Sequence, residues 1–294
     1  MPELPDIENY RDALTERVAG QPLTQLRIDH PFVLRTAVPP IADAEGKRVR
    51  EIRRLGKRIV LAQDDDLFLV LHLMIAGRLR WLDPGSSPPK RITLARFVFP
   101  AGMLAFTEAG TKRRASLHLV RGEDALAAMD PGGLEALTAG RDRFAERLAL
   151  ENHTLKRALT DPRLFSGIGN AYSDEILHRA RLSPLALTKT LSAAEVARLH
   201  DATRAVLDEW TARLRAERGG GFPDKVTAFR PGMAVHGKFG TPCPACGAPV
   251  QRIVYAENEC NYCARCQTGG KLLADRSLSR LLKASWPGSI DDLG

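Results

Sequence analysis

Residues 243–266 read CPACGAPVQRIVYAENECNYCARC and contain all five cysteines of the chain. Cys243 and Cys246 form one Cys-x-x-Cys pair, and Cys263 and Cys266 form a second. Each pair lets two thiolates bind one ion, and two pairs at this spacing close a tetrahedral four-cysteine zinc site. Cys260 also forms a Cys-x-x-Cys with Cys263, but we favour Cys266 as the fourth ligand. The sequence therefore predicts one structural zinc ion with no coordination position left open for chemistry.

The composition excludes several classes of protein. The 294 residues are 44% hydrophobic and 27% charged, which suits two or more folded domains. Lysine and arginine number 43 against 35 acidic residues, and the net charge of +8 predicts an anionic partner such as nucleic acid. The chain has no apolar run long enough to span a membrane, and its acidic start does not fit a secretion signal. We expect a soluble, cytoplasmic protein that does not bind membranes.

The first 130 residues are typical of a β-rich domain. Short apolar runs alternate with turn clusters of Asp, Pro and Gly, as at Arg58–Ala62, Leu67–His72 and Arg96–Phe99. Strands this short and regularly interrupted predict a β-sandwich or barrel. Ile7–Val18 is the exception, because its apolar residues recur at helical spacing and predict one N-terminal helix.

Beyond Asp130 the pattern changes to helices. Ala, Leu, Glu and Arg recur at helical period, with predicted helices at Leu155–Thr160, Ala171–Ala180 and Ser192–Leu214. Ser192 and Glu195 form a capping box that starts the last of these helices. Gly219–Pro223 (GGGFP) is predicted to be a hinge. We therefore predict an α+β, multi-domain protein with a β-sandwich and flanking helix at 1–130, a helical domain at 131–222, a zinc finger at 233–270 and an extension at 271–294.

A glycine turn in the helical domain is a candidate anion site. Gly167-Ile-Gly-Asn170 precedes a predicted helix, where glycines let backbone N–H groups approach an anion and the helix dipole favours negative charge. Asn170 is expected to cap that helix, and Lys156 and Arg163 are expected to add positive charge beside it. The alternative interpretation is a plain glycine turn between two packed helices.

The N-terminus offers a candidate nucleophile. Removal of Met1 leaves Pro2 with a secondary amine, and an α-amine has a pKa near ~8, so part of it is neutral at physiological pH. Attack on a sugar C1′ gives an iminium, whose fixed charge acidifies the C2′ protons and promotes elimination. Glu3 is positioned to supply or collect protons. The alternative is that the Met-Pro start has no catalytic role.

Six segments occur in an order that resembles a known family. They are Met1–Glu8 (MPELPDIE), Gly56-Lys57-Arg58, His72–Leu79 (HLMIAGRL), Gly167–Glu175 (GIGNAYSDE), His236–Gly240 (HGKFG) and the four-cysteine segment. Over nearly the whole chain, this order resembles the formamidopyrimidine-DNA glycosylase/endonuclease VIII family of DNA repair enzymes. The resemblance implies a β-sandwich, a helix-two-turn-helix domain and a zinc finger. It also implies that the partner is double-stranded DNA with damaged bases or abasic sites, whose damaged nucleotide is flipped out of the stack.

The resemblance implies roles for individual residues. The family's proline nucleophile falls on Pro2, its proton-handling glutamate on Glu3, and its phosphate-binding lysine of the sandwich on Lys57. Family residues that contact DNA phosphates fall on Lys156 and Asn170. The family's zinc ligands fall on Cys243, Cys246, Cys263 and Cys266. Without the resemblance, the alternative for Lys57 is a solvated charge at a strand end.

Departures from the family leave the lesion open. Asp6 replaces the usual glutamate and is one methylene shorter. Thr111–Ser116 replaces the family's Asp-Pro-Arg-Arg-Phe-Gly loop; it keeps an arginine at Arg113 but has Ala115 where an aromatic wedge is expected. We expect either Arg113 or an apolar loop to fill the gap left by the flipped base. That loop consists of Leu73, Met74 and Ile75.

Two further departures lie near the C-terminus. The family's zinc-finger arginine falls on Asn258, which brings no charge, and Arg265 or the basic tail is expected to compensate. The chain also continues past Cys266, where a set of leucines predicts a helix that packs on the protein. The leucines are Leu272, Leu273, Leu278, Leu281 and Leu282. The alternative is an extra DNA contact through the basic residues Lys271, Arg276 and Arg280.

Taken together, the residues and the resemblance predict a bifunctional DNA glycosylase and abasic-site lyase that excises oxidised bases and cuts the strand by β- and δ-elimination. The MPELP start favours oxidised purines such as formamidopyrimidine and 8-oxoguanine, whereas the missing phenylalanine favours oxidised pyrimidines. A non-catalytic damaged-DNA-binding protein is a second alternative, but it has no chemical reason to keep Pro2, Glu3 and Lys57. A zinc-ribbon module is a third, and it leaves the N-terminus unexplained. We expect a monomer with no cofactor besides zinc.

Overall fold

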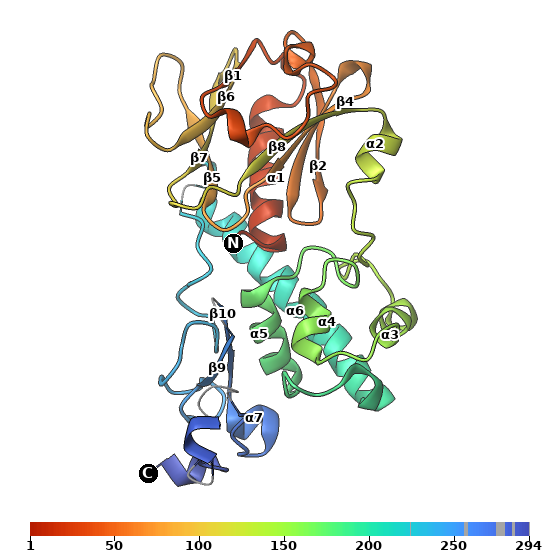
Figure 1. Ribbon diagram of the computed structural model, residues 1–294, viewed down its shortest axis with the longest axis vertical. Coiled ribbons are helices and arrows are strands. Elements are labelled where there is room, and N and C mark those ends of the chain that lie inside the picture. Colours follow the sequence, from red (N-terminus) through yellow and green to blue (C-terminus); the bar gives the residue numbers. More distant parts are fainter. Residues whose placement is uncertain (224, 256–257, 275–279, 284–285, 294) are drawn as a thin grey trace. The chain divides into compact units, whose positions relative to one another are not determined.

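The computed structural model describes residues 1–223, 225–255, 258–274, 280–283 and 286–293 and divides into two compact units (Figure 1). Unit 1 comprises Met1–Pro131 and Trp210–Thr227, and unit 2 comprises Gly132–Glu209 and Ala228–Gly294. Each unit therefore combines two separate segments of the chain, whereas the predicted domains were contiguous. The long helix α6 (Ala193–Arg218) begins in unit 2 and ends in unit 1. The predicted domain boundaries stay predictions.

Unit 1 contains two four-stranded antiparallel sheets (Figure 1). The first has the order β1 (Gln25–Ile28), β6 (Thr93–Phe99), β7 (Gly102–Glu108) and β5 (Gly77–Leu82). The second has the order β2 (Val49–Leu55), β3 (Arg58–Gln63), β4 (Leu67–His72) and β8 (Ser116–Arg121). Short 3₁₀ helices occupy Pro31–Val33, Ile41–Ala44 and Asp64–Asp66. The three predicted strands correspond to β3, β4 and β6, and the predicted sandwich is confirmed.

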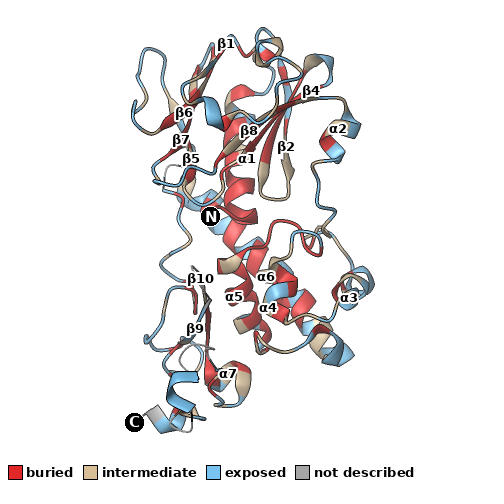
Figure 2. Ribbon diagram, viewed as in Figure 1, coloured by how far each residue is buried: buried red, intermediate tan, exposed pale blue. Residues whose placement is uncertain are grey.

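Helix α1 (Leu4–Val18) shares one hydrophobic core with both sheets. Ile7 and Leu14 of α1 lie in the same buried cluster as Leu79 of the first sheet and Leu69 of the second. Figure 2 shows α1 buried along most of its length. The predicted N-terminal helix is thus confirmed, and it begins three residues earlier than Ile7 because Glu3 takes the N-cap position.

Both faces of the second sheet are covered at its central strands, which explains why β3 and β4 are buried at nearly every position. In β4, Leu69 and Leu71 face the main core, whereas Phe68 and Val70 belong to a second cluster that includes Leu126. Leu126 comes from α2 (Glu123–Ala127). Because side chains alternate along a strand, an apolar run of this kind requires cover on both sides.

The segment predicted as a hinge is docked on unit 1. The Phe222 ring lies 5.7 Å from the Tyr10 ring and 6.4 Å from the Trp81 ring, measured between centroids. Arg17 stacks its guanidinium 5.5 Å from the Phe222 ring centroid and donates to the Gly220 carbonyl at 3.0 Å. Phe222, an aromatic side chain among the glycines, thus packs against the sandwich, and the hinge at Gly219–Pro223 stays a prediction.

Unit 2 contains the helical part of the chain. Its helices are α3 (Arg141–Ala149), α4 (Leu155–Thr160), α5 (Asn170–Ala180) and the first part of α6, with a 3₁₀ turn at Thr188–Thr190. The predicted capping box is confirmed: the Ser192 hydroxyl accepts from the Glu195 N–H at 3.3 Å, and the Glu195 carboxylate accepts from the Ser192 N–H at 2.8 Å. No helix in the described ranges is both long enough and apolar enough to cross a membrane.

The cysteine-rich part of unit 2 is a hairpin followed by a short helix. Strands β9 (Gln251–Tyr255) and β10 (Asn258–Tyr262) pair antiparallel, and α7 (Ala264–Thr268) follows. The chain after α7 folds back on this module, since Lys271 pairs with Ser289 and a last 3₁₀ turn occupies Ile290–Leu293. We call residues 233–274 the zinc module, after the metal that the sequence predicts there.

The predicted C-terminal helix is only partly described. Leu272 packs in the core of the zinc module and Leu273 packs partly against it. Leu281 and Leu282 are exposed, so the prediction that they pack on the protein is wrong; Ile290 fills that core instead. Arg276 and Leu278 lie outside the described residues. Asn258 begins β10, and its side chain is likewise outside the description.

Candidate functional site

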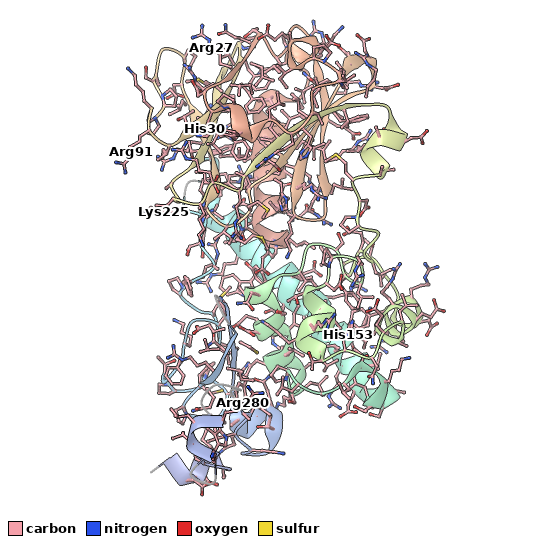
Figure 3. All side chains as sticks on the ribbon, viewed as in Figure 1. Arg27, His30, Arg91, His153, Lys225 and Arg280 are labelled. Carbon is pink, nitrogen blue, oxygen red and sulfur yellow. The ribbon has the colours of Figure 1, made fainter. Side chains whose placement is uncertain are left out.

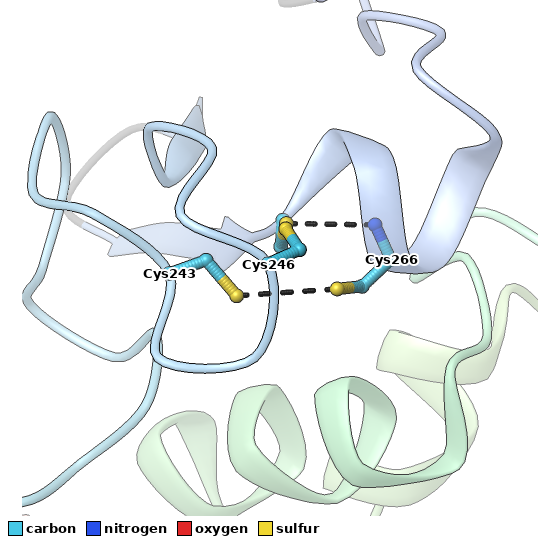
Figure 4. Close-up of side chains that lie close together, drawn as sticks. Cys243, Cys246 and Cys266 are labelled. Atoms are coloured by element: carbon cyan, nitrogen blue, oxygen red, sulfur yellow. Dashed lines mark hydrogen bonds between the residues drawn. The ribbon is translucent and has the colours of Figure 1, made fainter.

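The four predicted zinc ligands come together in the zinc module. The sulfur atoms of Cys243, Cys246, Cys263 and Cys266 all lie within 4.8 Å of one another. Sγ of Cys243 lies 3.9 Å from that of Cys266, and Sγ of Cys246 lies 3.4 Å from that of Cys263. Figure 4 shows Cys243 and Cys246 on one loop, facing Cys266 of α7. Four sulfurs converging on one point have the geometry of a tetrahedral metal site.

The chemistry of these sulfurs also fits a bound cation. Burial raises the pKa of the Cys263 thiol to about 11, so without a cation this thiol holds its proton at neutral pH. A divalent metal replaces the protons and lets the thiolates form. Cys260 lies outside the cluster, buried beside Asp174, in agreement with the choice of Cys266 as the fourth ligand.

Helix α5 meets the zinc module through its polar residues. Asn170, the first residue of α5, donates from Nδ2 to the Glu259 carbonyl of β10 at 2.9 Å. Gly169 takes the N-cap position, so the prediction that Asn170 caps the helix is off by one residue. The Glu175 carboxylate accepts three backbone N–H groups at 2.7–2.9 Å, from residues 234–236. Burial raises the pKa of Glu175, and these three donors act in the opposite direction.

Asp174 is a second buried carboxylate of this contact, and its partners come from several elements. Its side chain is fully buried, and Lys156 of α4 donates to its Oδ1 at 2.6 Å. Its Oδ2 accepts from His236 Nδ1 at 2.8 Å and from the Asn261 backbone N–H at 3.1 Å. One carboxylate thus joins α4, α5, the chain before the cysteines and β10.

Lys156 is held inside the protein. Besides Asp174, its ammonium donates to the Asn170 carbonyl at 2.6 Å and to the Ser173 hydroxyl at 2.8 Å. These three acceptors match the three N–H groups of an ammonium. The predicted phosphate contact of Lys156 stays a prediction. Arg163, also expected to add charge here, pairs with Asp161 at 2.6 Å.

The other candidate residues gather in unit 1 around the start of α1. Pro2 is buried, and the side chain of Glu3 is 2% exposed. The Asp6 carboxylate accepts from the Glu3 backbone N–H at 3.0 Å, so the shorter acid still makes the local contact that starts the helix. Both acidic side chains are therefore held beside the chain's amino group.

The electrostatic surroundings of that amino group combine two acids and two cations. Burial lowers the pKa of the Met1 amino group, and the charge of Glu3 opposes this shift. Arg78 and Lys57 lower the pKa further, whereas Asp6 raises it. Lys57, predicted from sequence alone, is thus brought within electrostatic reach of the N-terminus. Arg78 was not singled out by the sequence.

The turn that carries Lys57 is tied to α1 by a buried ion pair. Gly56 and Lys57 connect β2 to β3, and Gly56 has φ +60°, a backbone conformation that favours glycine. Arg54 donates to the Gly56 carbonyl at 3.1 Å and to the Glu8 carboxylate of α1 at 2.6 Å. Because both Arg54 and Glu8 are nearly fully buried, this pair holds the turn in one place relative to the N-terminus.

The apolar loop named from sequence is a tight turn between β4 and β5. The Gly77 N–H donates to the Leu73 carbonyl at 2.8 Å, and a Cβ on Gly77 would lie 2.2 Å from that oxygen. Met74 has φ +53°, a strained conformation for a residue with a side chain. Ile75 is 56% exposed at the tip, and Arg78 donates to its carbonyl at 3.1 Å. Ile75 is therefore exposed on a constrained turn, with Met74 half-buried beside it.

Arg113 and Ala115 lie on a loop that Glu108 anchors. The buried Glu108 carboxylate accepts from the backbone N–H groups of Arg114 at 3.1 Å and Ala115 at 3.2 Å. Arg113 is exposed and donates to the carbonyl of Arg91, a residue labelled in Figure 3. Ala115 is buried in the core, so it does not act as a wedge.

Comparison with known proteins places this geometry in a family. The N-terminal domain of formamidopyrimidine-DNA glycosylase matches residues 1–115, and the H2TH domain of the same enzyme matches residues 130–215. The formamidopyrimidine-DNA glycosylase of Thermus thermophilus is 36% identical over 284 residues, which cover 92% of this chain and all of the relative. The chain belongs to the formamidopyrimidine-DNA glycosylase family.

Other relatives and solved structures agree with this membership. An uncharacterized formamidopyrimidine-DNA glycosylase-like protein of Mycobacterium tuberculosis is 44% identical over 151 residues, covering 51% of this chain and 94% of the relative. The Thermus thermophilus crystal structure has a TM-score of 0.75 at 34% identity and covers 90% of this chain and 98% of its own. A Lactococcus lactis Fpg variant, crystallised with Fapy-dG-containing DNA, has a TM-score of 0.79 at 25% identity and covers 91% and 100%. By family, the protein is a DNA glycosylase.

For this glycosylase, sequence reasoning missed the residues that make the contacts between elements. Arg54 lies in no motif, and Arg78 was inside the HLMIAGRL segment without a role; the contacts of both depend on which turns they reach. Asp174 and Glu175 were inside the quoted GIGNAYSDE segment without a role. A signal for Asp174 existed, since it follows Asn170 by one helical turn and so lies on the same face of α5.

Proposed function

We propose that this glycosylase excises oxidised bases and then cuts the DNA strand at the resulting abasic site, with the Pro2 amine as nucleophile after removal of Met1. The amine nitrogen forms a bond to C1′ while the bond from C1′ to the base breaks, and the base leaves with the electron pair and takes up a proton. Protonation of O4′ by Glu3 opens the sugar ring and gives the iminium.

Strand cleavage follows from the positive charge of the iminium. Loss of a C2′ proton expels the 3′ phosphate (β-elimination), and a second proton loss expels the 5′ phosphate (δ-elimination). Water then hydrolyses the imine and frees the Pro2 amine. No nucleotide or redox cofactor is needed, because every step moves only protons and leaving groups.

The observation that carries this proposal is the environment of the amino terminus. Burial and the charges of Arg78 and Lys57 lower the pKa of the Met1 amino group, and removal of Met1 would leave the Pro2 amine next to the same groups, which favour a neutral, nucleophilic amine. Glu3, buried at the same place, is within electrostatic reach of this amine. A protein that only binds DNA has no use for an amine whose pKa is lowered beside a buried acid.

The cations around the amine suit the DNA backbone. We propose that Lys57 binds a phosphate at the lesion, because its turn is fixed by the Arg54–Glu8 ion pair rather than free to move with solvent. In unit 2, Asn170 at the start of α5 is proposed to contact a second phosphate, aided by the helix dipole. Lys156 is proposed to support this contact by holding the Asn170 carbonyl and by its own charge.

The proposed partner is double-stranded DNA, bound by a monomer. Lactococcus lactis Fpg has been crystallised with Fapy-dG-containing DNA and with abasic-site DNA, at TM-scores of 0.79 to this chain. The net charge of +8 favours such a polyanion. The four-cysteine cluster is proposed to bind one zinc ion that holds the β9–β10 hairpin in shape, since all four ligand positions are taken by protein sulfur.

Two classes of damaged base are candidate substrates, oxidised purines and oxidised pyrimidines. Formamidopyrimidine and 8-oxoguanine are favoured by family membership and by the MPELP start. Oxidised pyrimidines are favoured by Ala115, which is buried and has no ring to insert into the stack. We propose that the gap left by the flipped base is filled by Met74 and Ile75 on their constrained turn, with Arg113 as the alternative.

Borohydride trapping tests the proposal directly. Untagged protein is incubated with duplexes that carry 8-oxoguanine, a formamidopyrimidine, an oxidised pyrimidine or an abasic site, and the imine is reduced to a stable adduct. We expect a covalent adduct with the unmodified protein and none with a Pro2→Gly variant whose amino terminus is blocked by an N-terminal extension. The yield of adduct on each duplex ranks the lesions and so assigns the lesion class. Absence of an adduct even on the abasic duplex, with zinc-loaded protein, would overturn the lyase mechanism and favour the damaged-DNA-binding protein.

A further inference from the structure

His178 lies on the face of α5 that meets the zinc module. Asn170, Asp174 and His178 follow one another at intervals of four residues, so they occupy successive turns on one side of the helix. The first bonds to the Glu259 carbonyl of β10 and the second to the Asn261 N–H. His178, the third, places Nε2 at 3.3 Å from Sγ of Cys243, one of the four cluster cysteines.

The direction of this hydrogen bond follows from the chemistry of the sulfur. With a metal bound, Cys243 would be a thiolate that can only accept, so Nε2 of His178 would carry the proton. Both the neutral Nε2–H tautomer and the protonated ring have a proton there, and the bond therefore does not depend on the charge of the ring. Cys243 is 2% exposed and His178 is half-buried, so water competes poorly for either group.

We propose that His178 is a positioning residue of the metal site, donating from Nε2–H to the Cys243 thiolate and thereby strengthening metal binding and attaching the zinc module to α5. The inference rests on the zinc site of the proposed function. Four thiolates give a zinc complex net negative charge, and a donated hydrogen bond withdraws part of it and keeps the ligand deprotonated. Side chains that hydrogen-bond to metal ligands typically change metal affinity by about 10- to 100-fold when they are replaced.

The same contact has a functional consequence within unit 2. Asn170, which we propose as a phosphate contact, begins the helix on which His178 lies. Metal binding would fix the position of Cys243, and the hydrogen bond from His178 would then fix the C-terminal part of α5 against it. The metal site and the proposed phosphate contact are therefore joined by one rigid helix of eleven residues.

Four variants of the full-length protein separate hydrogen bonding from packing. His178→Phe keeps a ring and loses the donor. His178→Gln places an amide N–H where Nε2 stood, whereas His178→Asn keeps the polarity but is one bond too short. His30→Phe is the matched control, since His30 (labelled in Figure 3) belongs to unit 1, whereas the cysteines belong to unit 2.

The zinc dissociation constant is measured by competition with a chromophoric chelator. We expect zinc affinity about 10- to 100-fold weaker for His178→Phe and His178→Asn, rescue by His178→Gln, and no change for His30→Phe. In cobalt-substituted protein, loss of the donor should move the sulfur-to-metal charge-transfer band to lower energy.

Unchanged affinity in both His178→Phe and His178→Asn would overturn the inference, as would a His178→Gln variant as weak as His178→Phe, because packing alone then accounts for the residue. If His178→Phe does not fold, His178→Asn carries the comparison. Failure of the unmodified protein to bind zinc would instead refute the zinc assignment in the proposed function, and the trapping assay tests the catalytic part independently of both.

Discussion

Replacing Asp174 by asparagine should destabilise unit 2, because this buried carboxylate is shared by partners on three other segments. Oδ1 accepts from the Lys156 ammonium at 2.6 Å, and Oδ2 accepts from His236 Nδ1 and the Asn261 N–H at 2.8 and 3.1 Å. Asparagine has nearly the same shape but only one acceptor oxygen. Whichever way its amide turns, an NH₂ group faces a donor.

The magnitude follows from what remains unpaired. If the amide oxygen keeps His236 and Asn261, the NH₂ group faces Lys156, whose ammonium retains only the Asn170 carbonyl and the Ser173 hydroxyl. Removing one partner of a buried ion pair costs about 3–5 kcal/mol. We expect a loss of this size in the free energy of unfolding. Asp208→Asn, at an exposed position of α6, should stay within about 0.5 kcal/mol of the unmodified protein.

Urea denaturation at neutral pH, followed by circular dichroism, measures both variants. Adding Lys156→Met to Asp174→Asn removes the second charge, and the double variant should recover part of the loss because the uncompensated ammonium is gone. A cost below about 1 kcal/mol for Asp174→Asn, or no recovery in the double variant, would refute the assignment of Asp174 as the carboxylate that holds these segments together.

Four further outcomes are expected. Glu3→Gln should abolish base excision and leave DNA binding nearly unchanged, as measured by gel-based cleavage and fluorescence anisotropy; normal excision would remove Glu3 from the mechanism. Cys246→Ser should lose bound zinc and DNA affinity together, and a metal-free variant that still binds DNA tightly would contradict a structural metal. An N-terminal tag that prevents removal of Met1 should eliminate both excision and strand cleavage, whereas retained cleavage would show that Pro2 is not the nucleophile. Burial and the charge of Arg58 lower the pKa of His72 from 6.5 to about 4, so the unfolded chain binds this proton more readily and stability is lost as the pH falls from 6.5 toward 4. Urea titrations at pH 7 and pH 5 measure how much the free energy of unfolding falls between the two. This fall should be about 2 kcal/mol smaller for His72→Gln than for the unmodified protein, and equal falls would contradict the lowered pKa of His72.

Features caused by residues close together in the sequence were predictable from it. The capping box of Ser192 and Glu195 starts α6 because both hydrogen bonds close within one turn. The apolar run Leu67–His72 formed strand β4 as predicted. The four cysteines were identified as a cluster because their spacing and ligand chemistry have few other uses. The order of motifs along the chain was sufficient to recognise the family.

Partners separated by many residues were decided only by the tertiary structure. Composition suggested that Gly219–Pro223 was a hinge, yet Phe222 packs on Tyr10 of α1. The sequence predicted that Lys156 contacts a DNA phosphate. In the structure its ammonium lies at the α4–α5 contact and donates to three acceptors of the protein.

The same limit applies to the metal site and the amino terminus. Nothing local distinguishes His178 from the other histidines until the fold places Cys243 beside its ring. Lys57 and Arg78 likewise reach the amino terminus only because the sandwich brings the β2–β3 turn and β5 to the start of α1. A sequence pattern shows what a side chain is able to donate, accept or bury, whereas its actual partner depends on which faces pack together to remove apolar surface from water.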